Sequence, residues 1–308
     1  MTSAIREPVV AGEFYPADAR DLEDEVRELL ACAVAPRTER PIGLVAPHAG
    51  YVFSGLIAAD AYAQAADHPY DLVVLLGTNH SAPGFTRVSV FTGSGFRTPL
   101  GTAPVDGDAA RALLAADPDG TPDPRPHLLE HSIEVQVPFV QVVFPGAAIL
   151  PVLVGRDEPG LCGRLGAALA RVLAGRRALV VASSDLSHYP AYEDAAAADR
   201  AVLAAIARLD SGGLRTAIAA EEDARRRGLR TCACGSAPVL AAMAAARALG
   251  ATRGVVVSHA SSGDAPRGDR AHVVGYGAVA FTAGAPGADL AALDEPPHAL
   301  PYPPGGPP

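Results

Sequence analysis

Four short apolar runs in this chain each end abruptly in polar residues. The runs cover residues 42–46, 72–76, 178–181 and 255–257, and a histidine follows each of them within seven positions. Apolar runs of this length, bounded by turn residues, are typical of buried strands. In an open α/β sheet the carboxyl ends of the strands line the ligand crevice, so the four endings predict one site at one edge of a sheet.

Helix-like patterns alternate with the apolar runs. They predict helices over residues 21–34, 55–66, 109–116, 161–173, 195–209 and 238–249. This alternation favours an α/β layer architecture. Because neither an internal repeat nor a linker interrupts the middle of the chain, we expect a single domain.

The end of the chain has a different composition. After Phe281 the sequence becomes rich in glycine, alanine and proline. Such a segment buries too little apolar surface to offset the entropy lost on ordering it. The sequence therefore predicts a domain over residues 1–282 and a disordered tail over residues 283–308, and we do not expect His298 in this tail to be a ligand.

Composition limits the partners and the chemistry. Hydrophobic residues form 49% and charged residues 19% of the 308 residues, which is typical of a soluble protein with a buried core. The net charge of -9 argues against nucleic acid or an anionic membrane as partner. No apolar stretch approaches the roughly 18 residues of a spanning helix, so we expect a cytoplasmic protein. The sequence contains no lysine, which excludes a Schiff-base lysine and a P-loop lysine.

Four histidines lie in segments dense with small and polar residues: His48, His80, His131 and His188. A shared metal ion would explain them together, because neutral imidazole binds iron, copper and zinc. The alternative is that each is a hydrogen-bonded structural histidine.

Two of these histidines have a carboxylate at a spacing of three. His131 and Glu134 would share a helix face, either as ligand and supporting carboxylate or as a proton-transfer pair. The alternative is a capping carboxylate beside a surface histidine. Asp185 could orient His188 in the same way, for support or for acid–base catalysis. Ser183 and its neighbour Ser184 are weak candidates for a hydrolase nucleophile, because no Gly-x-Ser-x-Gly motif surrounds them.

Two cysteines precede a predicted helix. Cys234 stands before Gly235 at the expected helix start, where a thiol is biased towards thiolate and becomes a better ligand or nucleophile. Cys232 is two residues away, so in an extended chain the two side chains face opposite sides. A Cys-x-Cys pair alone is a weak zinc signal, and a buried pair without a role is the alternative.

Seven motifs, in order along the chain, resemble those of a known family. They are Pro47-His48-Ala49-Gly50-Tyr51, Gly77-Thr78-Asn79-His80, Thr98-Pro99-Leu100-Gly101, Glu130-His131-Ser132-Ile133-Glu134, Ser183-Ser184-Asp185-Leu186-Ser187-His188-Tyr189, Cys234-Gly235 and Val274-Gly275-Tyr276. Together they are similar to the Memo family, whose bacterial form is called AmmeMemoRadiSam system protein B. The resemblance runs from about Arg6 to Phe281 and covers nearly everything except the tail.

This resemblance implies a fold related to class III extradiol dioxygenases, with a central mixed β-sheet flanked by helices. It implies a metal pocket of two histidines and one cysteine, which here are His48, His80 and Cys234. Around this pocket it places His131, Asp185 and His188. The chain departs from the family pattern at Thr78, where proline is common, at Phe96, where tryptophan is common, and at the additional thiol of Cys232.

The resemblance also suggests partners. The animal relative is linked to iron or copper binding, redox signalling and the capture of phosphotyrosine-containing receptor segments. Prokaryotic members are associated with a radical-SAM protein and a protein of the AMMECR family. We therefore expect partners of these two kinds, together with an unknown small molecule or peptide in the pocket.

Three functional hypotheses follow. The first is a redox enzyme in which His48, His80 and Cys234 bind Fe(II) or Cu(I), while His131, Asp185 and His188 handle protons or substrate. A cysteine ligand softens the site and argues against simple extradiol ring cleavage. The second is a non-catalytic module that binds a partner or peptide in the same pocket, and the third is a zinc-dependent hydrolase.

Overall fold

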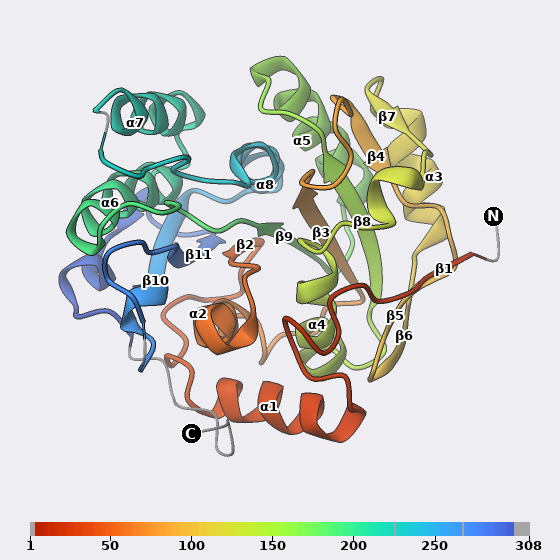
Figure 1. Cartoon of the computed structure of the whole chain (residues 1–308). Coiled ribbons are helices and arrows are strands. Elements are labelled where there is room, and N and C mark those ends of the chain that lie inside the picture. Colours follow the sequence, from red (N-terminus) through yellow and green to blue (C-terminus); the bar gives the residue numbers. More distant parts are fainter. Residues whose placement is uncertain (1–3, 225, 267, 299–308) are drawn as a thin grey trace.

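The computed structural model describes residues 4–224, 226–266 and 268–298, which form helical layers around one large sheet (Figure 1). The sheet has nine strands in the order β12-β10-β11-β2-β9-β3-β8-β4-β7. These strands are β2 (Gly43–Ala46), β3 (Leu72–Thr78), β4 (Val88–Val90), β7 (Gly120–Thr121), β8 (Ala148–Val154), β9 (Ala178–Ser183), β10 (Arg253–Ser261), β11 (Gly275–Thr282) and β12 (Gly287–Asp289). A smaller sheet contains β1 (Ile5–Arg6), β5 (Gly95–Thr98) and β6 (Gly101–Pro104) in the order β1-β5-β6.

Helices cover both faces of the large sheet (Figure 1). They are α1 (Ala19–Ala31), α2 (Tyr51–Ala63), α3 (Gly107–Ala116), α4 (Val137–Val143), α5 (Pro159–Leu173), α6 (Tyr192–Ala207), α7 (Ser211–Asp223) and α8 (Ser236–Ala248). One hydrophobic core lies under α1, α2 and α4, and a second lies under α3, α5, α6 and α8. The α/β prediction with a mixed sheet is confirmed, and six of these helices coincide with predicted stretches. Of the other two, α7 was not predicted, whereas α4 begins at Val137, later than the helix expected around His131 and Glu134.

Strand direction brings the polar endings together. Strands β2, β9, β3 and β8 are mutually parallel, and Ala46 at the end of β2 pairs with Ser183 at the end of β9. In β3, Leu76 pairs with Ala182 of β9, so the three strands end at the same level. The segments that follow β2, β3 and β9 therefore meet at one edge, as the sequence predicted.

The fourth polar ending differs from the prediction. Strand β10 does not stop at Val257; after a bulge it continues to Ser261, and His259 pairs with Gly277 of β11 inside the sheet. His259 lines a separate cavity of about 340 Å³ beside α6. Continued pairing with β11 keeps His259 within the strand and out of the predicted site, whereas Ser262, from the same polar ending, lines the cavity together with His48 and His80.

The first part of the expected disordered tail also needs correction. Residues 287–289 form β12, which pairs in parallel with β10, and the 3₁₀ turn η4 (Ala291–Asp294) follows. Ion pairs join Asp289 to Arg253, Asp294 to Arg200 and Glu295 to Arg37. Composition alone missed these charge partners, which lie far away in sequence. Residues 299–308 lie outside the described part of the chain.

Among the described residues, no helix is both long enough and apolar enough to cross a membrane.

Candidate metal centre

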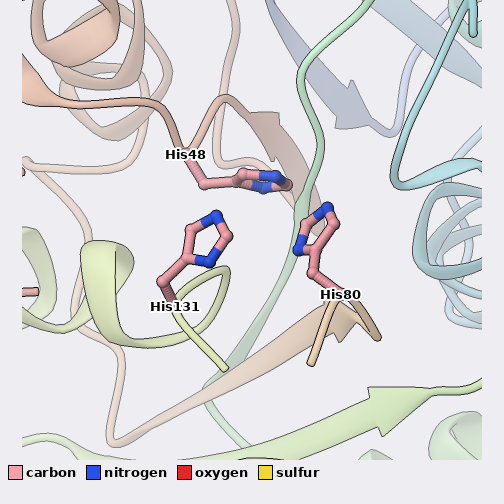
Figure 2. A group of neighbouring side chains, drawn as sticks. All are labelled: His48, His80 and His131. Atoms are coloured by element: carbon pink, nitrogen blue, oxygen red, sulfur yellow. The ribbon is translucent and has the colours of Figure 1, made fainter. Parts of the chain in front are cut away.

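The segments after β2, β3 and β9 bring several potential ligands together. His48 follows β2, His80 follows β3, and Asp185 follows β9. His131 comes from the turn before the 3₁₀ segment η2 (Glu134–Gln136), and Cys234 lies just before α8. Figure 2 shows the three imidazole rings converging from separate segments.

The potential ligand atoms form two overlapping groups among the described residues. One group contains His48, His80 and His131, and the other contains His48, Asp185 and Cys234; within each group the ligand atoms lie within 4.8 Å of one another. The rings of His80 and His131 stack with centroids 4.8 Å apart, and Sγ of Cys234 lies 3.3 Å from Nε2 of His48. The expected ligand set of His48, His80 and Cys234 therefore spans both groups and shares His48 between them.

The hydrogen bonds of Ser183 assign the tautomer of His48. The Ser183 hydroxyl donates its only proton to the carbonyl oxygen of Ser132 at 2.7 Å and accepts from the Gln136 amide at 2.9 Å. Nδ1 of His48 lies 2.9 Å from the same hydroxyl oxygen, so Nδ1 must carry the proton. The Nε2 lone pair then faces Cys234. Burial lowers the pKa of His48 well below its usual value, and the neighbouring His80 and His131 lower it further.

A buried carboxylate supports His80. Glu130 is 1% exposed and accepts from the backbone nitrogen of His80 at 2.6 Å and from its Nδ1 at 3.0 Å. It also accepts from the backbone nitrogen of Ser132 at 2.9 Å. Burial alone would raise the pKa of Glu130, but the hydrogen bonds from His80 and Ser132 outweigh it and lower the pKa to about 2. The ionised carboxylate therefore holds the proton of His80 on Nδ1 and leaves Nε2 free.

The expected pair of His131 and Glu134 does not form. Glu134 instead forms an ion pair with Arg6 and accepts hydrogen bonds from the backbone of Val9 and from the Tyr15 hydroxyl. His131 precedes the 3₁₀ segment, so the helical spacing assumed from the sequence does not apply. Glu134 thus binds the N-terminal segment. The carboxylate close to His131 is that of Glu130, whose Oε1 lies 3.7 Å from Nδ1 of His131.

The expected pair of Asp185 and His188 is also absent as a hydrogen bond. Asp185 accepts from the backbone nitrogen of His48 at 2.7 Å, and burial raises its pKa. Nδ1 of His188 lies 2.9 Å from the carbonyl oxygen of Leu186, which places its proton on Nδ1. Both side chains nevertheless line the same cavity.

The two cysteines lie in different surroundings. Cys232 is fully buried in the hydrophobic core, where burial raises its pKa to about 12. Burial also raises the pKa of Cys234, and the charge of Asp185 adds to this effect. The expected bias of Cys234 towards thiolate at a helix start is therefore outweighed while no cation is near. Its thiol can donate to Nε2 of His48 or, at 3.7 Å, to the carbonyl oxygen of Asp185.

A cavity of about 740 Å³ opens above these ligands. Its lining includes His48, His80, His131, Asp185, His188, Phe14, Val52, Phe53, Tyr189, His272 and Tyr276. Val52, Phe53 and Tyr189, which are between 41% and 49% exposed, gather at this cavity as one apolar rim. The site thus combines a polar floor with an apolar rim, as ligand pockets generally do.

Comparison with known proteins identifies the family of this chain. The family model described as Memo-like protein matches residues 6–280. This chain belongs to the Memo family. MEMO1 family proteins from Aquifex aeolicus and Methanosarcina acetivorans are each 37% identical to it, over 90% and 89% of this chain and 99% and 98% of their own lengths. The MEMO1 family protein from Caldivirga maquilingensis is 33% identical over 90% of this chain and 98% of its own.

A solved structure supports the fold of this Memo-family chain. The uncharacterized protein JW3007 from Escherichia coli K12 has a TM-score of 0.51 and 13% sequence identity. The similarity covers 78% of this chain and 100% of that chain. At this level of identity the likeness concerns the fold alone.

The donor set of this Memo-family site fits a metal ion. His48 is buried and His80 is exposed, and the Nδ1 proton of each ring is held by a neighbouring oxygen atom, which leaves the Nε2 lone pair free. This arrangement is usual for histidine ligands in metalloproteins. A thiol and a buried carboxylate lie on the other side of His48. The site could therefore hold one ion of a metal that accepts nitrogen and sulfur ligands.

Sequence reasoning missed part of this Memo-family site. Glu130 was not singled out, although it adjoins His131 in the same motif. Ser183 was considered only as a nucleophile, whereas its hydroxyl is 1% exposed and fully used in the hydrogen bonds behind His48. Their roles depend on partners that are 50 and 135 residues away in the chain.

Proposed function

We propose that this Memo-family protein is a metal-dependent redox enzyme that binds Fe(II) or Cu(I) through His48, His80 and Cys234. The observation that supports the proposal is the donor arrangement: His48 and His80 line a cavity of about 740 Å³, and the thiol of Cys234 lies 3.3 Å from Nε2 of His48. Thiolate and imidazole ligands together suit copper, iron and zinc. A bound iron or copper ion would supply one-electron redox chemistry, and zinc, which lacks it, is the less favoured ion.

The surrounding residues can manage protons and substrate. Burial raises the pKa of Asp185, so this carboxyl group can hold a proton closer to neutral pH than an exposed aspartate. His188 keeps Nε2 free because Nδ1 donates to Leu186. His131 faces the same cavity and packs edge-on against Phe14, with ring centroids 5.1 Å apart. In this proposal His131, Asp185 and His188 bind substrate or transfer protons.

Metal analysis of anaerobically purified protein tests the proposal. After iron or copper supply we expect about one ion per chain, and much less in His48→Ala. His272→Ala is the matched control, because His272 lines the same cavity but its side chain is 69% exposed. Less than about a tenth of an equivalent in the wild type under both supplies would defeat the proposal. Zinc that cannot be replaced by iron or copper would favour the hydrolase instead.

The exposed apolar rim supports a second candidate function, a module that binds a partner. Val52, Phe53 and Tyr189 could contact an apolar or aromatic group of a peptide or protein. The proposed partners are a radical-SAM protein and a protein of the AMMECR family. If the pocket only docks a partner, capture of the radical-SAM protein should survive metal removal and fail in Phe53→Ser. Capture that disappears with the metal would contradict this candidate.

A further inference from the structure

Polar groups behind the two imidazoles form one connected network. The Ser132 hydroxyl donates to the carbonyl oxygen of Thr78 at the end of β3, and the carbonyl oxygen of Ser132 accepts from Ser183 at the end of β9. Ser183 in turn accepts the Nδ1 proton of His48, while Glu130 binds both His80 and the backbone of Ser132. The turn around Ser132 therefore connects Ser183, which contacts His48, with Glu130, which contacts His80.

Ser183 and Glu130 can each accept a hydrogen bond from Nδ1–H, but neither has a free proton to donate to Nδ1. The single proton of Ser183 is committed to the Ser132 carbonyl, so the hydroxyl meets His48 as an acceptor. Both oxygen atoms of Glu130 receive hydrogen bonds: one from the backbone nitrogen of His80, the other from Nδ1 of His80 and the nitrogen of Ser132. An ionised carboxylate is an acceptor only. Neither imidazole can move its proton to Nε2 without losing its hydrogen bond at Nδ1.

We propose that Ser183 and Glu130 are positioning residues that fix His48 and His80 as Nδ1–H tautomers, so that both Nε2 lone pairs face the metal position before an ion arrives. The part of this inference that concerns metal affinity rests on the proposed function. The tautomers themselves are a property of the metal-free protein and are tested separately. Partners of this kind usually change metal affinity about 10- to 100-fold when they are replaced.

Glu130→Gln is the sharpest variant, because it keeps the shape and removes one acceptor. If the glutamine oxygen faces Nδ1 of His80, its NH₂ group opposes the backbone N–H of His80, donor against donor. If the amide turns round, its NH₂ group faces Nδ1, which must then accept, so the ring proton moves to Nε2. The first orientation keeps the Nδ1–H tautomer but leaves the backbone N–H of His80 without an acceptor, and the second orientation does the same to the backbone N–H of Ser132. Because each orientation costs one hydrogen bond, both should be populated, and the second carries His80 in the Nε2–H form.

Glu134→Gln is the matched control. Glu134 is also a buried carboxylate of the same segment, four residues away, but it binds Arg6, Val9 and Tyr15 and contacts neither imidazole by a hydrogen bond. The Glu134→Gln variant should have a lower thermal midpoint of unfolding but unchanged tautomers of His48 and His80. A shift in tautomer therefore cannot be ascribed to lost stability.

Nitrogen-15 NMR of the histidine rings in metal-free protein reads the tautomers directly. We expect a protonated Nδ1 and a bare Nε2 for His48 and His80 in wild type and in Glu134→Gln. Glu130→Gln should populate the Nε2–H form of His80, and Ser183→Ala should do so for His48. The inference would be overturned if Glu130→Gln and Ser183→Ala both kept the wild-type tautomers, or if His48 and His80 were in the Nε2–H form in the wild type. Ser183→Ala is the smaller change. If Glu130→Gln does not fold, the tautomer of His48 in Ser183→Ala tests the inference.

Competition with a colorimetric Cu(I) chelator gives the second readout. Per folded chain, Glu130→Gln and Ser183→Ala should bind Cu(I) about 10- to 100-fold more weakly than wild type, and Glu134→Gln should bind within a few-fold of it. Equal affinities in all four proteins would refute the positioning role. If even the wild type binds no Cu(I) or Fe(II), the proposed function fails while the tautomer measurement still decides the inference.

Discussion

The two neighbouring cysteines differ in how well they are placed to be a ligand of the candidate metal centre. Cys234 lies 3.3 Å from Nε2 of His48, whereas Cys232 is fully buried in the hydrophobic core. We expect Cys234→Ser to weaken iron or copper binding by at least about 10-fold, and Cys232→Ser to keep wild-type stoichiometry. Metal content per folded chain, measured side by side after anaerobic purification, checks this prediction. Equal metal content in wild type and Cys234→Ser would exclude Cys234 as a ligand.

The protonation of Cys234 makes metal uptake dependent on pH. Because burial raises the pKa of this thiol, it carries a proton at neutral pH, and a metal must displace that proton to bind sulfur. His48 needs no deprotonation there, because its pKa is lowered. Uptake should therefore release about one proton per ion and weaken as the pH falls. A pH indicator in weakly buffered solution measures the release, which Cys234→Ser should abolish; no release from the wild type would argue against thiolate ligation.

The residues of the site show where reading the sequence succeeds and where it stops. His48, His80 and Asp185 were placed together because three apolar runs end in polar turns, and parallel strands bring such endings to one edge. The pairing of His131 with Glu134 was misjudged because it assumed a helix that begins only after His131. Glu130 escaped notice because its role comes from His80, which is close in space but 50 residues away in sequence.

At the scale of elements, the approach of α8 to β9 sets the position of Cys234. A side chain at Gly235 would place its Cβ 2.4 Å from the carbonyl oxygen of Ser183, so only glycine allows this approach. Gly235→Ala should push the start of α8 away from the strand. We expect about 1–3 kcal/mol of lost stability and weaker metal binding, measured by denaturant unfolding and by chelator competition.

The control for this change is Gly163→Ala in α5. A Cβ at Gly163 meets no atom within 4 Å, so alanine should raise stability by up to about 1 kcal/mol through its better helix propensity. Metal affinity should stay at the wild-type value. If Gly235→Ala behaved like Gly163→Ala in both measurements, the close packing of α8 against β9 would not determine the site.

The elements themselves were predictable to different degrees. Buried parallel strands such as β3 and β9 are continuous apolar runs, and an amphipathic helix such as α1 shows its periodicity, with Leu22, Val26 and Leu29 buried. The helix α7 and the strand β12 were missed. Strand β12 consists of three residues that pair with β10, and that pairing leaves no periodic signal in the sequence.

Over the whole molecule, the last described residues are tied back to the body of the protein. Nδ1 of His298 lies 2.8 Å from Oδ2 of Asp60, which is completely buried in α2, and the backbone nitrogen of His298 donates to the carbonyl oxygen of His259. Helix α2 begins at Tyr51, three residues after His48. The C-terminal segment therefore contacts the helix that leads away from the metal centre.

The hydrogen bond between His298 and Asp60 predicts that the C-terminal segment opens less often at low pH. The hydrogen bond with Asp60 raises the pKa of His298 above its usual value. A raised pKa in the folded state adds stability that is fully present below the unfolded pKa of about 6.5 and is lost as the pH rises through the folded value. Hydrogen exchange of residues 287–298 should therefore be slower at pH 6 than at pH 8.5, after correction for intrinsic rates. His298→Ala should remove this difference; an equal pH effect in the variant would assign it to other groups.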